Sequence, residues 1–104
     1  MGTGVAGKRE VEIQYTKKAS GMRDGLSKSR LAILELLEAD LRETGGKPFG
    51  RGWASLGEVR LKDNTEAMHC HINPRNVAVW RMLVDQFKII CKFIYVGSRE
   101  KAPY

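Results

Sequence analysis

Residues 68–104, MHCHINPRNVAVWRMLVDQFKIICKFIYVGSREKAPY, carry the clearest strand pattern in the chain. Apolar residues alternate with histidines along residues 68–72, and this period of two predicts a half-buried strand. An Asn-Pro-Arg-Asn turn at 73–76 leads into a second predicted strand, 77–84, and a two-residue link leads into a third, 87–96. Because short links join neighbouring antiparallel strands, these three form a predicted meander.

The last strand of this meander has two unlike faces. Lys88 and Lys92 lie on the more open face, together with aliphatic residues. The other face is expected to be the core face, where a helix docks, and it carries Phe87, Ile89, Cys91, Phe93 and Tyr95.

Before this segment in the chain, residues 27–44 are the clearest predicted helix, because leucines recur there at helical spacing. Ser27 or Ser29 caps its N-terminus, and Gly45 ends it. The leucine stripe is expected to cover a core. The acidic residues of this helix, Glu38 among them, are expected to be solvated.

The rest of the chain adds weaker signals. Residues 11–16 alternate and predict a strand, while residues 17–26 suit a loop or a short helix. Residues 45–67 contain five glycines and are predicted to be loops, anchored to the core by Trp53 and Leu56. The predicted fold is therefore α+β, with an N-terminal strand and one main helix packed on one face of an antiparallel sheet that ends in the meander.

The chain has 104 residues, which is room for one small domain. We expect a flexible tail at 1–10 and a single domain at 11–104. No apolar run approaches the roughly 18 residues of a spanning helix, and the start of the chain lacks the apolar core of a secretory signal. Cys70 and Cys91 lie in apolar runs, so we expect buried free thiols and a cytoplasmic protein, although neighbouring strands would allow them to pair.

The net charge of +6 is unevenly distributed. Residues 1–30 carry +4, residues 31–45 carry −3, and residues 46–104 carry +5. A small basic domain favours a polyanionic partner such as a nucleic acid, and the positive surface must come from the segments that flank the acidic helix.

The His69-Cys70-His71 segment is the most unusual local feature. On a strand the two histidines point to the same face, about 7 Å apart. They could chelate a metal, act in acid/base chemistry or contact RNA, or simply lie on a wet sheet face. Zinc requires three or four ligands, and the cysteines fall on the expected core face, so no metal site is predicted.

The C-terminal segment after Gly97 is the second unusual feature. It presents Arg99 and Lys101 and stops at Tyr104, which could stack on a nucleobase. A frayed polar tail is the alternative, and composition alone favours it.

Residues 68–104 resemble the C-terminal sheet of RelE/ParE-like toxins, and more closely the branch of cytotoxic translational repressors of toxin–antitoxin systems. The resemblance rests on HCH at 69–71, VAVW at 77–80 and the ending EKAPY at 100–104, and LLEADLRETG at 36–45 matches as well. It implies helices packed on an antiparallel sheet and cleavage of mRNA in the ribosomal A site by attack of a ribose 2′-hydroxyl on the adjacent phosphate. The implied partners are mRNA, the ribosome with its rRNA and a cognate antitoxin, with no membrane and no cofactor.

The resemblance also implies roles for single residues. Arg99 lies where RelE-like toxins have an arginine that stabilises charge on the phosphate, and Tyr104 matches their late tyrosine, which orients or stacks the base. His69 and His71 take the place of strand lysines and act as base or phosphate contact. Further basic residues are expected to bind RNA: Arg75, Arg81, Lys88, Lys92 and Lys101.

Two departures from the family pattern stand out. A family arginine position falls in the apolar residues 77–80, where Arg75 or Arg81 would have to substitute. The closer branch has a histidine where Arg99 stands, and arginine does not readily give up a proton.

Two other function classes remain. A ParE-like toxin inhibits gyrase by protein contact, and the basic sheet and paired histidines argue against it. A non-catalytic RNA-binding module is the third candidate, but the chain lacks the aromatic signature of an RRM.

Overall fold

The computed structural model describes residues 10–45 and 52–104. The predicted tail at 1–10 lies outside the described residues, except for Glu10, which begins the first strand. The elements, in chain order, are β1 (Glu10–Tyr15), α2 (Lys17–Asp24), α3 (Lys28–Thr44), β2 (Gly57–Arg60), β3 (Glu66–Asn73), β4 (Asn76–Val84), β5 (Lys88–Ser98) and the short 3-10 helix η1 (Arg99–Lys101). Within the described residues, no helix is long and apolar enough to cross a membrane.

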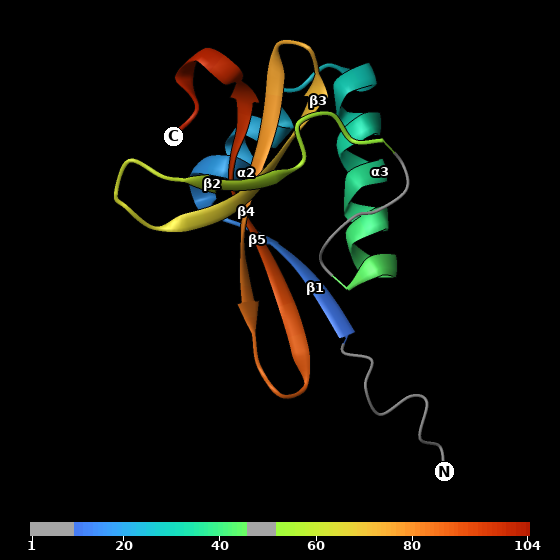
Figure 1. Ribbon diagram of the computed structural model, residues 1–104. Coiled ribbons are helices and arrows are strands. Elements are labelled where there is room, and N and C mark those ends of the chain that lie inside the picture. Colours follow the sequence, from blue (N-terminus) through green and yellow to red (C-terminus); the bar gives the residue numbers. More distant parts are fainter. Residues whose placement is uncertain (1–9, 46–51) are drawn as a thin grey trace.

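All five strands belong to one sheet, in the order β1-β5-β4-β3-β2 (Figure 1). The predicted α+β fold is confirmed, and so is the meander of β3, β4 and β5. The sheet is mixed rather than fully antiparallel, because β1 pairs parallel to β5. Nearly the whole chain separates these two strands, so no tight turn forces them to run in opposite directions.

Part of the segment expected to be loops is a strand. β2 pairs antiparallel with the first half of β3, with Gly57 opposite His69 and Arg60 opposite Glu66. Four residues are too short to show a clear alternation, which is why the pattern did not reveal this strand. Trp53 and Leu56 pack against the core as predicted.

Both helices begin at a side-chain cap. The backbone N–H of Arg30 donates to Ser27 Oγ at the start of α3, and that of Ala19 donates to Thr16 Oγ1 at the start of α2. Gly45 ends α3 in the left-handed conformation, with φ of 76°, as the sequence predicts. The leucine stripe packs on the sheet and is fully buried at Leu34, Leu37 and Leu41.

The two faces of the sheet carry separate apolar clusters. The α3 side holds Cys70, Ile72, Ala78, Trp80, Ile89, Cys91, Phe93 and Val96. The opposite side holds Leu61, Ala67, Val77, Val79, Tyr95 and Ala102.

The odd-numbered side chains of β5 change from one face of the sheet to the other part of the way along the strand. Phe93 pairs with Trp80 and Tyr95 pairs with Val79, so Ile94 is an extra residue in the ladder. Because of this bulge, Tyr95 packs opposite α3, whereas Phe93 packs on the α3 side. The predicted core face therefore holds for the middle of the strand but is wrong at Tyr95, and also at Phe87, which is 77% exposed.

Glu38 is buried, contrary to the expectation of a solvated acidic face. Its Oε2 accepts hydrogen bonds from the hydroxyl of Tyr15 and, at 3.3 Å, from Nε of Arg23. Burial raises the pKa of the Tyr15 hydroxyl well above its usual range, and the Glu38 carboxylate raises it further. The Tyr15 ring also stacks on Phe93, so these contacts join β1, α2 and α3 to β5.

Cys70 and Cys91 are buried free thiols, as predicted. They lie on β3 and β5, which are separated by β4, so their strands are not neighbours. Burial raises the pKa of Cys70 to about 12 and that of Cys91 to about 11.

We predict that Glu38→Ala lowers the free energy of unfolding by about 2 kcal/mol, because it leaves the Tyr15 hydroxyl and the Arg23 guanidinium without their shared acceptor. Urea denaturation measures the effect. The matched control is Glu35→Ala, which removes a long and more exposed ion pair to Arg23 and should cost less than about 0.5 kcal/mol. Equal losses in the two variants would contradict a special role for Glu38.

We predict that neither thiol reacts with iodoacetamide at pH 8 in the native protein and that both react in denaturant. Since both pKa values are raised above about 9 on folding, the folded state retains these protons to higher pH than the unfolded chain does. The free energy of unfolding should therefore fall as the pH rises from about 9 towards 12. Rapid native labelling of either cysteine would contradict its burial.

Candidate functional site

His69 and His71 lie on β3, on the face of the sheet opposite α3, since their neighbours Cys70 and Ile72 point into the α3-side core. Nδ1 of His69 is 3.0 Å from the carbonyl oxygen of Gly57 on β2. A carbonyl only accepts, so this contact places the proton of a neutral ring on Nδ1 and leaves the Nε2 lone pair available. A neutral His69 ring in this orientation can accept a hydrogen bond at Nε2.

The C-terminal segment is docked rather than frayed. The backbone N–H of Lys62 donates to the Pro103 carbonyl at 2.8 Å, and Ala102 is buried in the cluster opposite α3. The Tyr104 ring meets His69 edge to face, with ring centroids 5.1 Å apart. In Figure 1 the chain end returns from η1 towards β2. Of the two interpretations of this tail, the ordered one holds.

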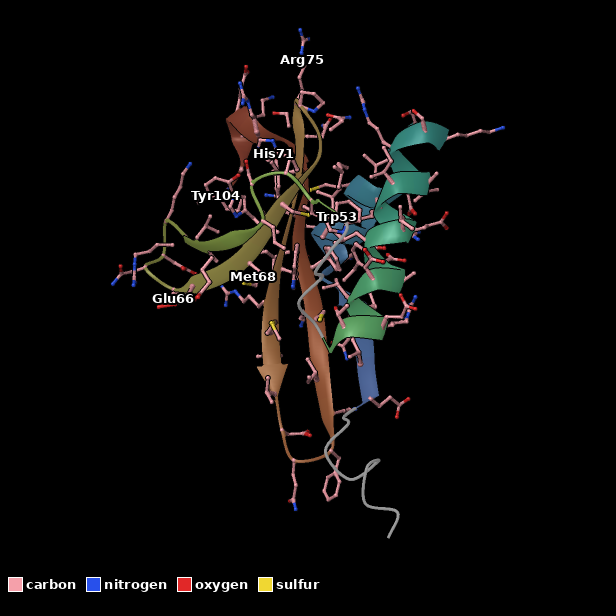
Figure 2. All side chains as sticks on the ribbon, turned by 45° about the vertical axis from the view of Figure 1, so that its right-hand side comes forward. Trp53, Glu66, Met68, His71, Arg75 and Tyr104 are labelled. Carbon is pink, nitrogen blue, oxygen red and sulfur yellow. The ribbon has the colours of Figure 1, made fainter. Side chains whose placement is uncertain are left out.

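Arg99 begins η1, and its backbone N–H donates to the Arg75 carbonyl at 2.9 Å, which ties η1 to the β3–β4 turn. The Arg75 side chain extends away from the end of the sheet in Figure 2. Burial raises the pKa of Tyr104 and the nearby Tyr95 adds to this, whereas the Arg99 guanidinium lowers it, with a net upward shift. Arg99 and Tyr104 are therefore electrostatic neighbours.

The four residues predicted to be catalytic thus come together at the end of the sheet where β3 and β5 finish. The rings of His69 and His71 are 6.4 Å apart, and Tyr104 packs on His69. His71 and Arg99 line one groove. Together they present two imidazoles, a guanidinium and a phenol, a set suited to acid/base chemistry beside an anion. Within residues 10–45 and 52–104, no group of three or more His, Cys, Asp or Glu side chains is placed to hold a metal ion.

The residues predicted to bind RNA are more scattered. Arg75 and Lys101 lie at the same end of the sheet as Arg99. Lys88 lies at the other end of β5, roughly 33 Å away by strand rise, and its Nζ is 3.1 Å from Glu12 Oε1.

Arg81 and Lys92 lie opposite each other on the neighbouring strands β4 and β5. Nη2 of Arg81 is 3.1 Å from Asp63 Oδ2. The cations that lie beside the histidines are thus only a subset of those that the sequence suggested.

A groove beside this site was not foreseen. It has a volume of about 570 Å³ and is lined by Ile33, Leu36, Gly52, Trp53, Ala54, His71, Ile72, Asn73, Pro74 and Arg99. Trp53 Nε1 donates to the buried Asp40 carboxylate at 2.8 Å, and the backbone N–H of His71 donates to the Ala54 carbonyl. A tryptophan in a Gly-rich segment was the only sequence signal, and it indicated anchoring rather than a groove wall.

No family model matches the sequence, and no curated protein matches it. Solved structures do match. The YoeB/ParE toxin from Agrobacterium tumefaciens has a TM-score of 0.68 at 12% identity, over 85% of this chain and 98% of that one. YafQ from E. coli strain BL21(DE3) has a TM-score of 0.61 at 18% identity, over 89% and 96%. A copper-bound mutant toxin from Helicobacter pylori has a TM-score of 0.59 at 18% identity, over 86% and 96%.

These matches cover nearly the whole length of each toxin, although few residues are identical. At such low sequence identity, these matches show that the backbones have a similar arrangement. The resemblance predicted from the HCH, VAVW and EKAPY motifs is confirmed in that sense, and the chain has the fold of the RelE/ParE-like toxins.

Proposed function

We propose that this chain is the toxin of a toxin–antitoxin system and cleaves mRNA on the ribosome by attack of a ribose 2′-hydroxyl on the adjacent phosphate. The observation that carries the proposal is the convergence of His69, His71, Arg99 and Tyr104 at one end of a RelE/ParE-like sheet. Residues that come from two separate segments of the chain supply two imidazoles, a guanidinium and an aromatic ring within one site.

His69 is the proposed general base. Its Nδ1 is held by the Gly57 carbonyl, so Nε2 can accept the proton of the 2′-hydroxyl. The 2′-oxygen then bonds to phosphorus, the bond to the 5′-oxygen breaks, and a cyclic 2′,3′-phosphate results. The Arg99 guanidinium stabilises the negative charge that builds on the phosphate.

The leaving 5′-oxygen must gain a proton, and Arg99 cannot provide it because guanidinium does not give up protons at neutral pH. His71 lines the same groove as Arg99, and an imidazole can carry and release a proton near neutral pH. We therefore assign it the role of acid. This resolves the departure from the branch that carries a histidine at the position of Arg99.

Tyr104 is proposed to orient the site. Its ring packs on His69, and its upward-shifted pKa keeps its hydroxyl protonated at neutral pH. It can therefore restrict the imidazole and offer an aromatic edge to a base at the cut.

The remaining partners follow from this activity. Arg75 and Lys101 would contact RNA phosphates beside the site, with Lys92, Arg81 and Lys88 as more distant contacts. A ribosome-dependent enzyme acts in the cytoplasm, and a cognate antitoxin would neutralise it.

We predict that Arg99→Ala, His69→Ala and His71→Ala each reduce mRNA cleavage by about 100-fold or more and relieve growth arrest on induction. Primer extension on translated mRNA measures the cuts. The matched control is Arg42→Ala, which removes the same charge from an exposed position on α3 and should keep full toxicity.

Other outcomes would identify other functions. Growth arrest with intact mRNA and trapped gyrase–DNA complexes would replace this proposal with the ParE-like one. RNA binding without any cleavage would favour the non-catalytic module. Stoichiometric zinc that is lost in the His69, His71 double variant would make the pair a metal site instead.

We predict a steep salt dependence for binding of single-stranded RNA, with roughly 0.7 in the slope of log K against log salt for each phosphate contacted. Arg99→Ala should reduce the slope by about that amount. Lys88→Ala should reduce it less, because Glu12 already partners that charge. Fluorescence anisotropy between 50 and 200 mM salt would measure both slopes. Equal reductions would show that Lys88 contributes as much to RNA binding as Arg99 does, and would contradict the predicted difference.

A further inference from the structure

The groove lined by Trp53, His71 and Arg99, here called the Trp53 groove, extends the candidate site towards α3. Its volume of about 570 Å³ falls in the range of roughly 300–1,000 Å³ that is typical of small-ligand pockets. Ile33 and Leu36 of α3 form one wall. Figure 2 shows Trp53 beside α3, near the end of the sheet that carries His71. The groove shares His71 and Arg99 with the candidate site, although His69 lies on the face of the sheet opposite α3.

The aromatic wall of the groove is held in place. Trp53 is partly exposed, and its indole N–H donates to Asp40 Oδ2 at 2.8 Å. Asp40 is only 2% exposed and lies on α3, so the indole is tethered to the helix. The loop that carries the tryptophan is tethered to β3 through the backbone hydrogen bond from His71 to Ala54. A rigid aromatic surface binds a flat partner at a low cost in side-chain entropy.

The polar character of the groove favours an anionic ligand with an apolar, flat part. Among the described residues that line it there is no carboxylate, while Arg99 carries a positive charge. Arg75 and Arg99 also line a neighbouring hollow, together with Ser98 and Glu100. A nucleotide has this combination, since its phosphate suits the guanidinium and its base suits an aromatic and aliphatic surface.

We propose that the Trp53 groove binds the base of an RNA nucleotide adjacent to the phosphate that is cut, and so contributes to the choice of cleavage position. The proposal rests on the proposed function. The base would lie on Trp53 between Leu36 and Ile72, with its phosphate directed to Arg99. An apolar segment of an antitoxin is the competing occupant, but the Arg99 guanidinium that lines the groove and the continuity of the groove with the site favour the nucleotide.

Tryptophan fluorescence gives a direct test in the intact protein. The chain has two tryptophans, and Trp80 is fully buried, so quenching by a ligand reports on Trp53. The probes are AMP, GMP, CMP and UMP, with ribose 5-phosphate as the control without a base. We expect saturable quenching by at least one nucleotide and none by ribose 5-phosphate. Equal quenching by ribose 5-phosphate, or none by any nucleotide, would overturn the proposal.

Two matched variants locate the binding. Leu36→Glu places a carboxylate on the groove wall at a position that is 44% exposed, and it should weaken nucleotide binding about tenfold. Leu83→Glu makes the same change at a position on β4 that is 51% exposed and outside the groove, and it should bind within about twofold of wild type. Equal affinities in the two variants would overturn the placement.

Cleavage mapping separates this proposal from the proposed function. Leu36→Glu should change which positions in an mRNA are cut, whereas Leu83→Glu should leave the pattern unchanged. If both variants cleave at the wild-type rate with the wild-type pattern, the base-binding role of the groove is refuted and the proposed ribonuclease function stands. Nucleotide binding without cleavage would refute the ribonuclease and keep the base site. Loss of antitoxin neutralisation in Leu36→Glu, with unchanged nucleotide binding, would assign the groove to the antitoxin instead.

Discussion

The pairing of β4 with β5 is the constraint on which the rest of the molecule depends. Because Ile94 is an extra residue in this ladder, the side chains of β5 change faces between Phe93 and Tyr95. The first part of β5 can then pack on α3, while its end supports the opposite face, where the histidines lie. The same register brings Ser98 opposite Asn76, and so places Arg99 beside the turn that carries Arg75.

The conformation at the C-terminal end of β5 depends on Gly97 and Tyr95. The Tyr95 hydroxyl donates to the Ser98 carbonyl at 2.6 Å and passes close to Gly97. A Cβ at position 97 would lie 3.1 Å from that hydroxyl oxygen, which is tighter than ordinary contact. Glycine therefore allows the tyrosine to brace the start of η1, and η1 in turn carries Arg99 and leads to the docked Tyr104.

Several charged side chains of this protein lie next to a group of opposite charge. Glu38 is buried against Tyr15 and Arg23, while Glu12 and Asp63 accompany Lys88 and Arg81. The net charge of +6 alone suggested a broad basic surface. Where carboxylates accompany the cations, their field is reduced. The end of the sheet with Arg75, Arg99 and Lys101 also carries Glu100, but its cations outnumber this carboxylate, so it is the better place for a polyanion.

Local patterns in the amino-acid sequence predicted the capped leucine helix, the alternating strands of the meander, and the histidines that share one face of β3. Each of these depends on periodicity or on residues that are neighbours in the chain. The sequence also supplied the motifs behind the resemblance to the toxins. Two of its errors have a related origin, because neither the short β2 nor the bulge at Ile94 leaves a clear periodic signal.

Contacts between residues that are distant in the chain depend on the tertiary fold. The burial of Glu38 depends on Tyr15 and Arg23, which come from other elements, and the order of the tail depends on Lys62. The Trp53 groove requires α3, the loop before β2, the end of β3 and η1 to come together. Such contacts arise from strand register and helix docking, and a pattern confined to one segment of chain does not contain them.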